Sequence, residues 1–180
     1  ATELYILAYS EGMTPEIWDA LVRKGRTGAQ QLPIRFRKVG ILLDDSFSMS
    51  GTREQRLRPM AVALAMKDVL MNIGNSFLIR TASGRNIHSR NPIPKPVGRT
   101  ELAAVLIDLL ESDVDAVFII SDGYENAPSG RVDEVMHLLI EIGDKTPIYH
   151  LNPVIGTESR TGLSSLSEWI PTIPVSNPQG

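Results

Sequence analysis

VGILLDDSFSMSG, residues 39–51, is the stretch of this 180-residue chain that decides the fold. It begins with five apolar residues in a row, which is typical of a strand buried on both faces of a sheet. Two aspartates and three serines follow within the next seven residues. Ligands of open parallel sheets bind at the carboxyl ends of the strands. These polar residues are therefore candidates for a binding site.

Similar apolar runs recur along the chain and alternate with helical patterns. Strands are expected at 77–81, 116–120, 147–151 and 173–175, with a short partner strand at 86–88. Helices are expected at 57–73, 102–110, 132–142 and 162–169. Strands that alternate with helices indicate a parallel sheet covered on both sides. We therefore predict an α/β fold, with an open, mostly parallel twisted sheet flanked by helices on both faces.

The N-terminal part has a different pattern. Residues 1–38 are predicted to be an N-terminal segment with a short helix, ahead of a main domain at 39–180. Thr14, followed by a proline, is expected to cap that helix, and Gly25 is expected to end it. The Gly- and Gln-rich stretch at 26–33 then reads as a connector to the first strand.

Composition excludes several classes of protein. The chain has no cysteine, which removes disulfides, thiolate metal sites and cysteine nucleophiles. Its apolar runs are far shorter than the roughly 18 residues that span a bilayer, and it begins with no signal-peptide pattern, so we expect a soluble, cytoplasmic protein. GxSxG and phosphate-loop motifs are absent, and we expect no enzymatic activity. Because the sequence starts at Ala1, we expect a part of a larger chain or complex.

Charge is distributed unevenly. Residues 1–100 contain 15 Lys or Arg and 8 Asp or Glu, whereas residues 101–180 contain 3 and 13. Such asymmetry can mark a basic surface for an acidic or nucleic-acid partner. The alternative interpretation is that the two halves interleave in the fold and neutralise each other.

Oxygen-bearing side chains gather after the apolar runs. Asp44, Ser46 and Ser48 follow the first run, Thr100 follows a proline-rich loop, and Asp122 follows the run AVFII. Mg²⁺ prefers six oxygen ligands and keeps several waters. Hydroxyls two residues apart in a tight turn can face one point, and two strand-end carboxylates supply the charge. Taken singly, each residue could instead cap a helix or end a strand.

Together these motifs resemble the metal-ion-dependent adhesion site (MIDAS) of von Willebrand factor A (vWA) domains. The matching residues are Asp44-x-Ser46-x-Ser48, Gly98-x-Thr100-x-Leu102 and Ser121-Asp122-Gly123. The resemblance implies that Ser46, Ser48 and Thr100 contact the metal directly, whereas Asp44 and Asp122 act largely through water. It implies Mg²⁺, with Mn²⁺ or Ca²⁺ also possible, and makes 39–180 a vWA-like metal-binding domain. The implied function is metal-dependent capture of an Asp or Glu carboxylate of a partner protein.

Three neighbouring residues have open roles. Phe47 and Arg99 stand where the family often has a small residue and a glycine. Arg99 would place a cation at the mouth of the site. Asp45 is expected to point away from Asp44, because successive side chains of a strand face opposite sides.

RNA binding is the alternative function. The vWA fold also occurs in ribonucleoproteins that resemble the Ro autoantigen, where it is attached to helical repeats. Arginines and a lysine spread over 80–99 could contact phosphates. No aromatic residue lies among them to stack on bases, so this alternative ranks second.

Overall fold

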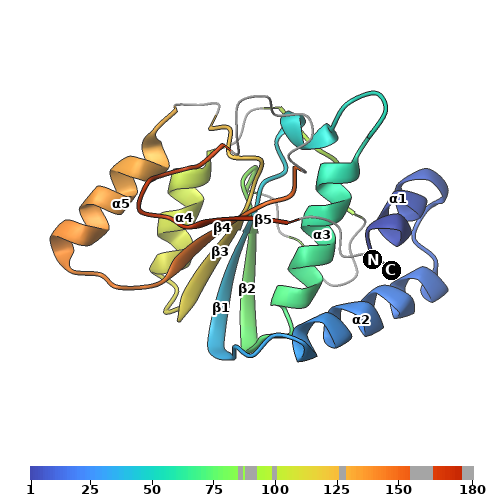
Figure 1. The fold of residues 1–180 in the computed structure, drawn as a ribbon, viewed down its shortest axis with the longest axis horizontal. Helices are drawn as coiled ribbons and strands as arrows, with labels where there is room; N and C mark the ends of the chain where they lie inside the picture. The colour runs from blue at the N-terminus through green and yellow to red at the C-terminus, as the bar shows by residue number, and fades with distance from the viewer. Residues whose placement is uncertain (85–86, 88–92, 99–100, 126–128, 155–163, 176–180) are drawn as a thin grey trace.

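The computed structural model describes residues 1–84, 87, 93–98, 101–125, 129–154 and 164–175. In these residues one sheet contains five strands, all parallel, in the order β2-β1-β3-β4-β5 (Figure 1). The strands are β1 (Phe36–Leu43), β2 (Gly74–Thr81), β3 (Ala116–Ile120), β4 (Ile148–Asn152) and β5 (Thr172–Pro174). The helices are α1 (Thr2–Glu11), α2 (Pro15–Gln30), α3 (Arg58–Leu70), α4 (Leu102–Leu110) and α5 (Arg131–Ile142), with a 3-10 turn η1 at Phe47–Ser50.

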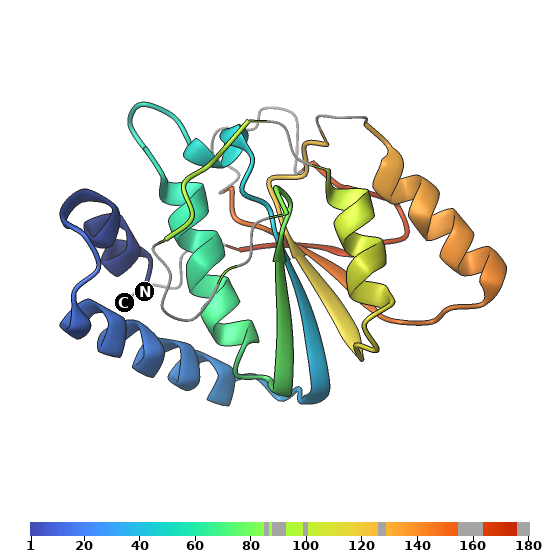
Figure 2. The same cartoon turned by 180° about the vertical axis from the view of Figure 1, so that it is seen from behind.

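Helices cover both faces of the sheet. Figures 1 and 2 show α3 on one side, with α1 and α2 outside it, and α4 and α5 on the other side. Side chains alternate between the two cores: Ile41 of β1 packs with α3, whereas Leu42 packs with α4. The predicted fold, an open parallel α/β sheet with helices on both faces, is confirmed.

The central strands are β1 and β3, and they are apolar where both of their faces are covered. Every residue of β3 is buried, as are the last five of β1. The chain passes from β1 to β2 on one side and then returns to β3 on the other. The carboxyl ends of β1 and β3 therefore form the switch point of the sheet, where ligands of such folds bind.

The N-terminal segment is more helical than predicted. The predicted cap at Thr14 is confirmed, since its hydroxyl accepts a hydrogen bond from the Ile17 amide at 3.3 Å. The prediction that Gly25 ends the helix is wrong, because α2 continues to Gln30. A Cβ atom at Gly25 would lie 2.9 Å from the Asp68 carbonyl oxygen of α3. Glycine is here the residue that lets two helices approach closely, rather than a helix terminator.

Two other predicted elements differ from the structure. The described part of the expected last helix, 164–169, is not helical but forms bends and turns. The short strand expected at 86–88 lies largely outside the described residues. Of the helices within the described ranges, none has the length and apolar character needed to cross a membrane.

Candidate metal centre

Asp44 lies at the point where the two central strands end. Leu43 of β1 is paired with Ile120 of β3, and the Asp44 amide donates to the Ile120 carbonyl at 2.9 Å. The Asp44 side chain is fully buried. Its Oδ1 accepts a hydrogen bond from the Ser46 amide at 2.9 Å, and its Oδ2 accepts one from the Ser121 hydroxyl at 2.6 Å. The carboxylate is thus held by donors from both central strand ends.

The two serines of the first motif face each other. The Oγ atoms of Ser46 and Ser48 are 2.9 Å apart, in the turn that leads into η1. Ser48 also lies close enough to Asp122, which follows β3, to lower the pKa of that carboxyl. The structure therefore brings Asp44, Ser46, Ser48 and Asp122 into one polar cluster at the carboxyl edge of the sheet.

Thr100 and Arg99 lie outside the described residues, so their positions are not assigned. The described part of their loop does reach the same edge. Val97 forms a parallel bridge with Ser46, and its amide donates to the Asp45 carbonyl at 2.8 Å. The Gly98 carbonyl accepts a hydrogen bond from the Phe47 amide at 3.3 Å.

Burial dominates the electrostatics of the two carboxylates. It raises the pKa of Asp44 above its ordinary value, against the hydrogen bonds from Ser121 and Ser46, and the charge of Asp122 raises it further. Burial likewise raises the pKa of Asp122, which is 4% exposed, against hydrogen bonds from Ser48 and the Tyr124 amide. Neither carboxylate forms an ion pair with any Lys or Arg in the described part of the chain. Within the described residues, these two buried acids therefore have no cationic partner.

The donor set fits a hard divalent cation. Its described members are two carboxylates and two hydroxyls, all oxygen atoms, which are the ligands that Mg²⁺ prefers. The described residues contain no cluster of three or more His, Cys, Asp or Glu side chains. An ion at this centre would therefore depend on hydroxyl oxygens and water as well as on the acids, as the sequence motifs predict.

Ser121 contacts the polar cluster in a way that the sequence motifs did not predict. Its hydroxyl donates to Asp44 and accepts from the Gly123 amide at 3.1 Å. Its carbonyl oxygen lies 2.8 Å from Nε2 of His150, whose Nδ1 is 3.1 Å from the Thr172 hydroxyl. The sequence feature that could have indicated this role is the position of Ser121 between an apolar run and Asp122. Only the register of β1 and β3 shows which acid Ser121 contacts.

His150 is a packed histidine of β4. It is fully buried, and burial lowers its pKa below the ordinary value. Asp45 points away from Asp44, as predicted. Its Oδ1 accepts a hydrogen bond from the Ser83 amide at 2.9 Å, whereas Asp44 accepts one from the Ser121 hydroxyl.

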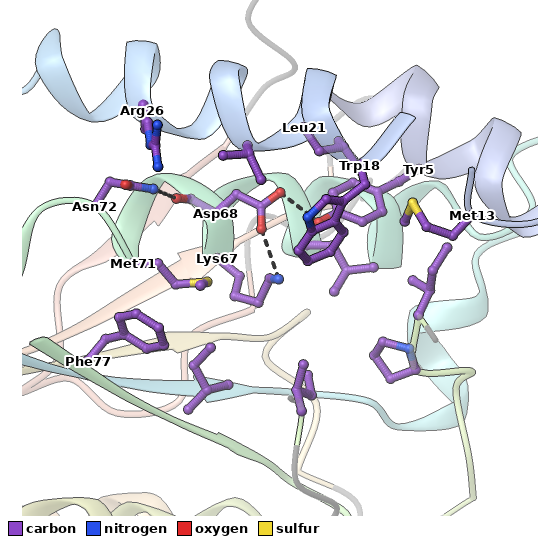
Figure 3. Close-up of a pocket in the computed structure, with 16 residues that line it drawn as sticks. Tyr5, Met13, Trp18, Leu21, Arg26, Lys67, Asp68, Met71, Asn72 and Phe77 are labelled. Carbon is purple, nitrogen blue, oxygen red and sulfur yellow. Dashed lines mark hydrogen bonds and ion pairs between the residues drawn. The ribbon is translucent and has the colours of Figure 1, made fainter. Parts of the chain in front are cut away.

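A separate cavity of about 450 Å³ lies between α2, α3 and the β2 edge (Figure 3). Its wall is mostly apolar but includes Asp68, whose carboxylate accepts from the Tyr5 hydroxyl at 2.6 Å and pairs with Lys67 at 2.8 Å. Burial and the Asp68 charge raise the pKa of Tyr5 well above its ordinary value, so the phenol stays a donor. These contacts join α1 to α3 and satisfy the polar groups within the wall.

Comparisons with known proteins support the fold. No protein-family model matches the chain, and no curated protein matches it. The structure is similar to the crystal structure of the Deinococcus radiodurans RO (RSR) protein, with a TM-score of 0.55 and 15% sequence identity. The alignment covers 96% of this chain and 39% of the Ro chain. At this identity the likeness shows the fold alone, an α/β Rossmann-like sheet of the vWA type.

Proposed function

We propose that this chain is a divalent-metal-dependent protein-binding module that captures an acidic residue of its partner. The observation that supports this proposal is the cluster at the switch point, where two buried carboxylates meet two serine hydroxyls 2.9 Å apart. Buried acids of this kind require either protonation or a cation. Mg²⁺ is the proposed ion, with Mn²⁺ or Ca²⁺ as substitutes.

The proposed roles follow from the donors. Ser46 and Ser48 hold the ion directly, together with Thr100, and Asp44 and Asp122 hold it largely through water. When bound, an ion with mostly neutral direct ligands supplies a positive charge that attracts an external carboxylate. We propose binding rather than catalysis, because both ring nitrogens of His150, the buried histidine nearest the cluster, are already engaged within the fold.

Isothermal titration with Mg²⁺, Mn²⁺ and Ca²⁺ tests the metal site. Asp44→Asn and Thr100→Ala should each weaken binding of the ion at least tenfold. Asp113→Asn is the matched control, because its side chain is 87% exposed and lies at the opposite end of β1, beside Arg37. Equal affinities in all three variants and the wild type would refute the site.

An affinity pull-down with and without a chelator tests the partner. A partner that is retained in Mg²⁺ and released by EDTA, and that is lost with Asp44→Asn, supports the proposal. A partner that is retained equally in EDTA contradicts metal-mediated capture.

RNA binding is the second candidate, favoured by the likeness to a Ro protein across 96% of this chain. The charge pattern gives it little support within the described residues. Arg80 forms an ion pair with Asp108 at 3.0 Å, and Arg37 pairs with Asp115 at 3.0 Å. These pairs join the basic and acidic halves of the sequence. Filter binding of single-stranded RNA over a salt series tests this candidate, since contacts with phosphates give a steep loss of affinity with salt.

A further inference from the structure

Two exposed aromatic side chains flank the candidate metal centre. Phe47 is 71% exposed and lies between the two serines of the first motif, and Tyr124 is 58% exposed and lies two residues after Asp122. Phe47 is next to Ser48 in sequence and Tyr124 is two residues after Asp122, so each aromatic residue lies within two residues of a member of the polar cluster. Aromatic side chains, tyrosine among them, are enriched among the residues that contribute most to the affinity of protein interfaces.

The backbone holds both aromatic residues at the centre. The Phe47 amide donates to the Gly98 carbonyl, and the Tyr124 amide donates to Asp122 Oδ1 at 3.1 Å. Gly123 has a φ of +85°, and a Cβ atom there would lie 2.5 Å from the Ser164 carbonyl oxygen. The turn before Tyr124 is therefore fixed by close packing. Little backbone entropy therefore remains to be lost when a partner binds at these positions.

The segment that follows the Phe47 turn contains two arginines, with the exposed acid Glu54 between them. The segment 51–57 follows η1 directly and folds back on it, since the Leu57 amide donates to the Ser50 carbonyl at 2.6 Å. Arg53 and Arg56 of this segment are exposed, and neither forms an ion pair within the described residues. Arg58, at the start of α3, is by contrast paired with Glu3.

We propose that the partner is an extended acidic peptide segment in which the captured Asp or Glu is next to a large apolar side chain. This inference rests on the proposed function. The carboxylate enters the metal centre, and the apolar side chain packs on Phe47 and Tyr124. Further acids of the segment face Arg53 and Arg56, so the charges of the two surfaces are complementary.

The arrangement favours a peptide over RNA. Single-stranded nucleic acid needs a basic groove that follows its backbone, with aromatic platforms along that groove. Here the aromatic residues are sequence neighbours of a cluster that contains two buried carboxylates, and the two arginines lie in a single segment. One carboxylate with an apolar neighbour matches this layout, whereas a chain of phosphates does not.

Fluorescence polarisation with the 180-residue chain in Mg²⁺ tests the proposal. The probes are labelled eight-residue peptides with one central Asp, which differ only in having Leu or Gly beside it, and an oligouridylate of the same length. We expect the Leu peptide to bind about tenfold more tightly than the Gly peptide, from the burial of one aliphatic side chain. Phe47→Ala and Tyr124→Ala should each remove most of that difference.

Trp169→Ala is the matched control. Trp169 is 50% exposed but packs edge-on against His137 of α5, away from the centre. The variant Trp169→Ala should leave the affinity for both peptides unchanged. The double variant Arg53→Glu with Arg56→Glu should weaken the binding of a peptide that carries additional acidic residues, and it should reduce the salt dependence of that binding.

Titration of each variant with Mg²⁺ alone separates the two levels of the proposal. If Phe47→Ala and Tyr124→Ala bind Mg²⁺ and both peptides as the wild type does, the aromatic surface is refuted while the metal centre stands. If the wild type binds no Mg²⁺, the proposed function itself fails. If Phe47→Ala and Tyr124→Ala weaken only the binding of the oligouridylate, the surface binds RNA, and the peptide proposal is overturned.

Discussion

Replacing Ser121 with alanine should destabilise the ion-free protein by about 2–4 kcal/mol. The hydroxyl donates to the buried Asp44 carboxylate at 2.6 Å and accepts from the Gly123 amide at 3.1 Å. A hydrogen bond to a charged group contributes about 1.5–3 kcal/mol, and one between neutral groups about 1 kcal/mol. Alanine removes both and places no new group in the cluster. For a chain of this size the melting temperature should fall by roughly 5–15 °C.

Urea unfolding followed by circular dichroism, without divalent ions and at several pH values, measures the effect. The loss should be largest at neutral pH and should shrink at acidic pH, because a protonated Asp44 needs fewer donors. Ser121→Thr keeps the hydroxyl and should lose less stability than alanine. A pH-independent cost, or equal stability of Ser121→Ala and the wild type, would show that this hydroxyl does not support the Asp44 carboxylate.

Three further predictions concern stability. Burial raises the pKa of Asp44 and Asp122. Without an ion, the contribution of these two acids to the free energy of unfolding is therefore most favourable below the ordinary Asp pKa, and it is lost as pH rises through the raised pKa values. Excess Mg²⁺ should reverse this pH dependence. The test is the difference in unfolding free energy between the wild type and the double variant Asp44→Asn with Asp122→Asn. Gly28→Ala should cost about 1 kcal/mol, because a Cβ atom would lie 2.8 Å from a Val69 methyl group of α3. Urea unfolding should show that cost disappear in a Val69→Ala background, and an equal cost in both backgrounds would contradict the contact. Thr14→Ala should cost about 1 kcal/mol in the same assay, through loss of the α2 cap, and an unchanged midpoint would count against that cap.

The sheet could be predicted from the sequence because its central strands are buried on both faces. A buried strand must be apolar throughout, so AVFII marked β3 with exact bounds. The carboxyl-end rule then placed Asp44 and Asp122 at one edge, and the hydrogen bond from Ser121, the residue before Asp122, to Asp44 agrees with that placement.

The remaining differences come from contacts between residues distant in sequence. Glycine normally ends a helix, but Gly25 faces α3, and tertiary packing outweighs its local preference. The helix α1 was not predicted, because the only apolar residues it buries are Tyr5 and Ala8. The role of Ser121 depended on strand register, which sets the acid that its hydroxyl meets.

The close packing of α2 on α3 has a practical consequence for dividing this protein. The helix α3 is apolar around most of its circumference, with Met60 through Ala65 all buried, because the sheet covers one side and the N-terminal helices cover the other. A fragment that starts at Phe36 would keep every strand, yet it would present the bare outer side of α3 to water. Such a fragment should aggregate or bind hydrophobic dyes, whereas the chain from Ala1 should remain monodisperse in size-exclusion chromatography. The smallest useful unit for isolating the candidate metal centre therefore includes α1 and α2.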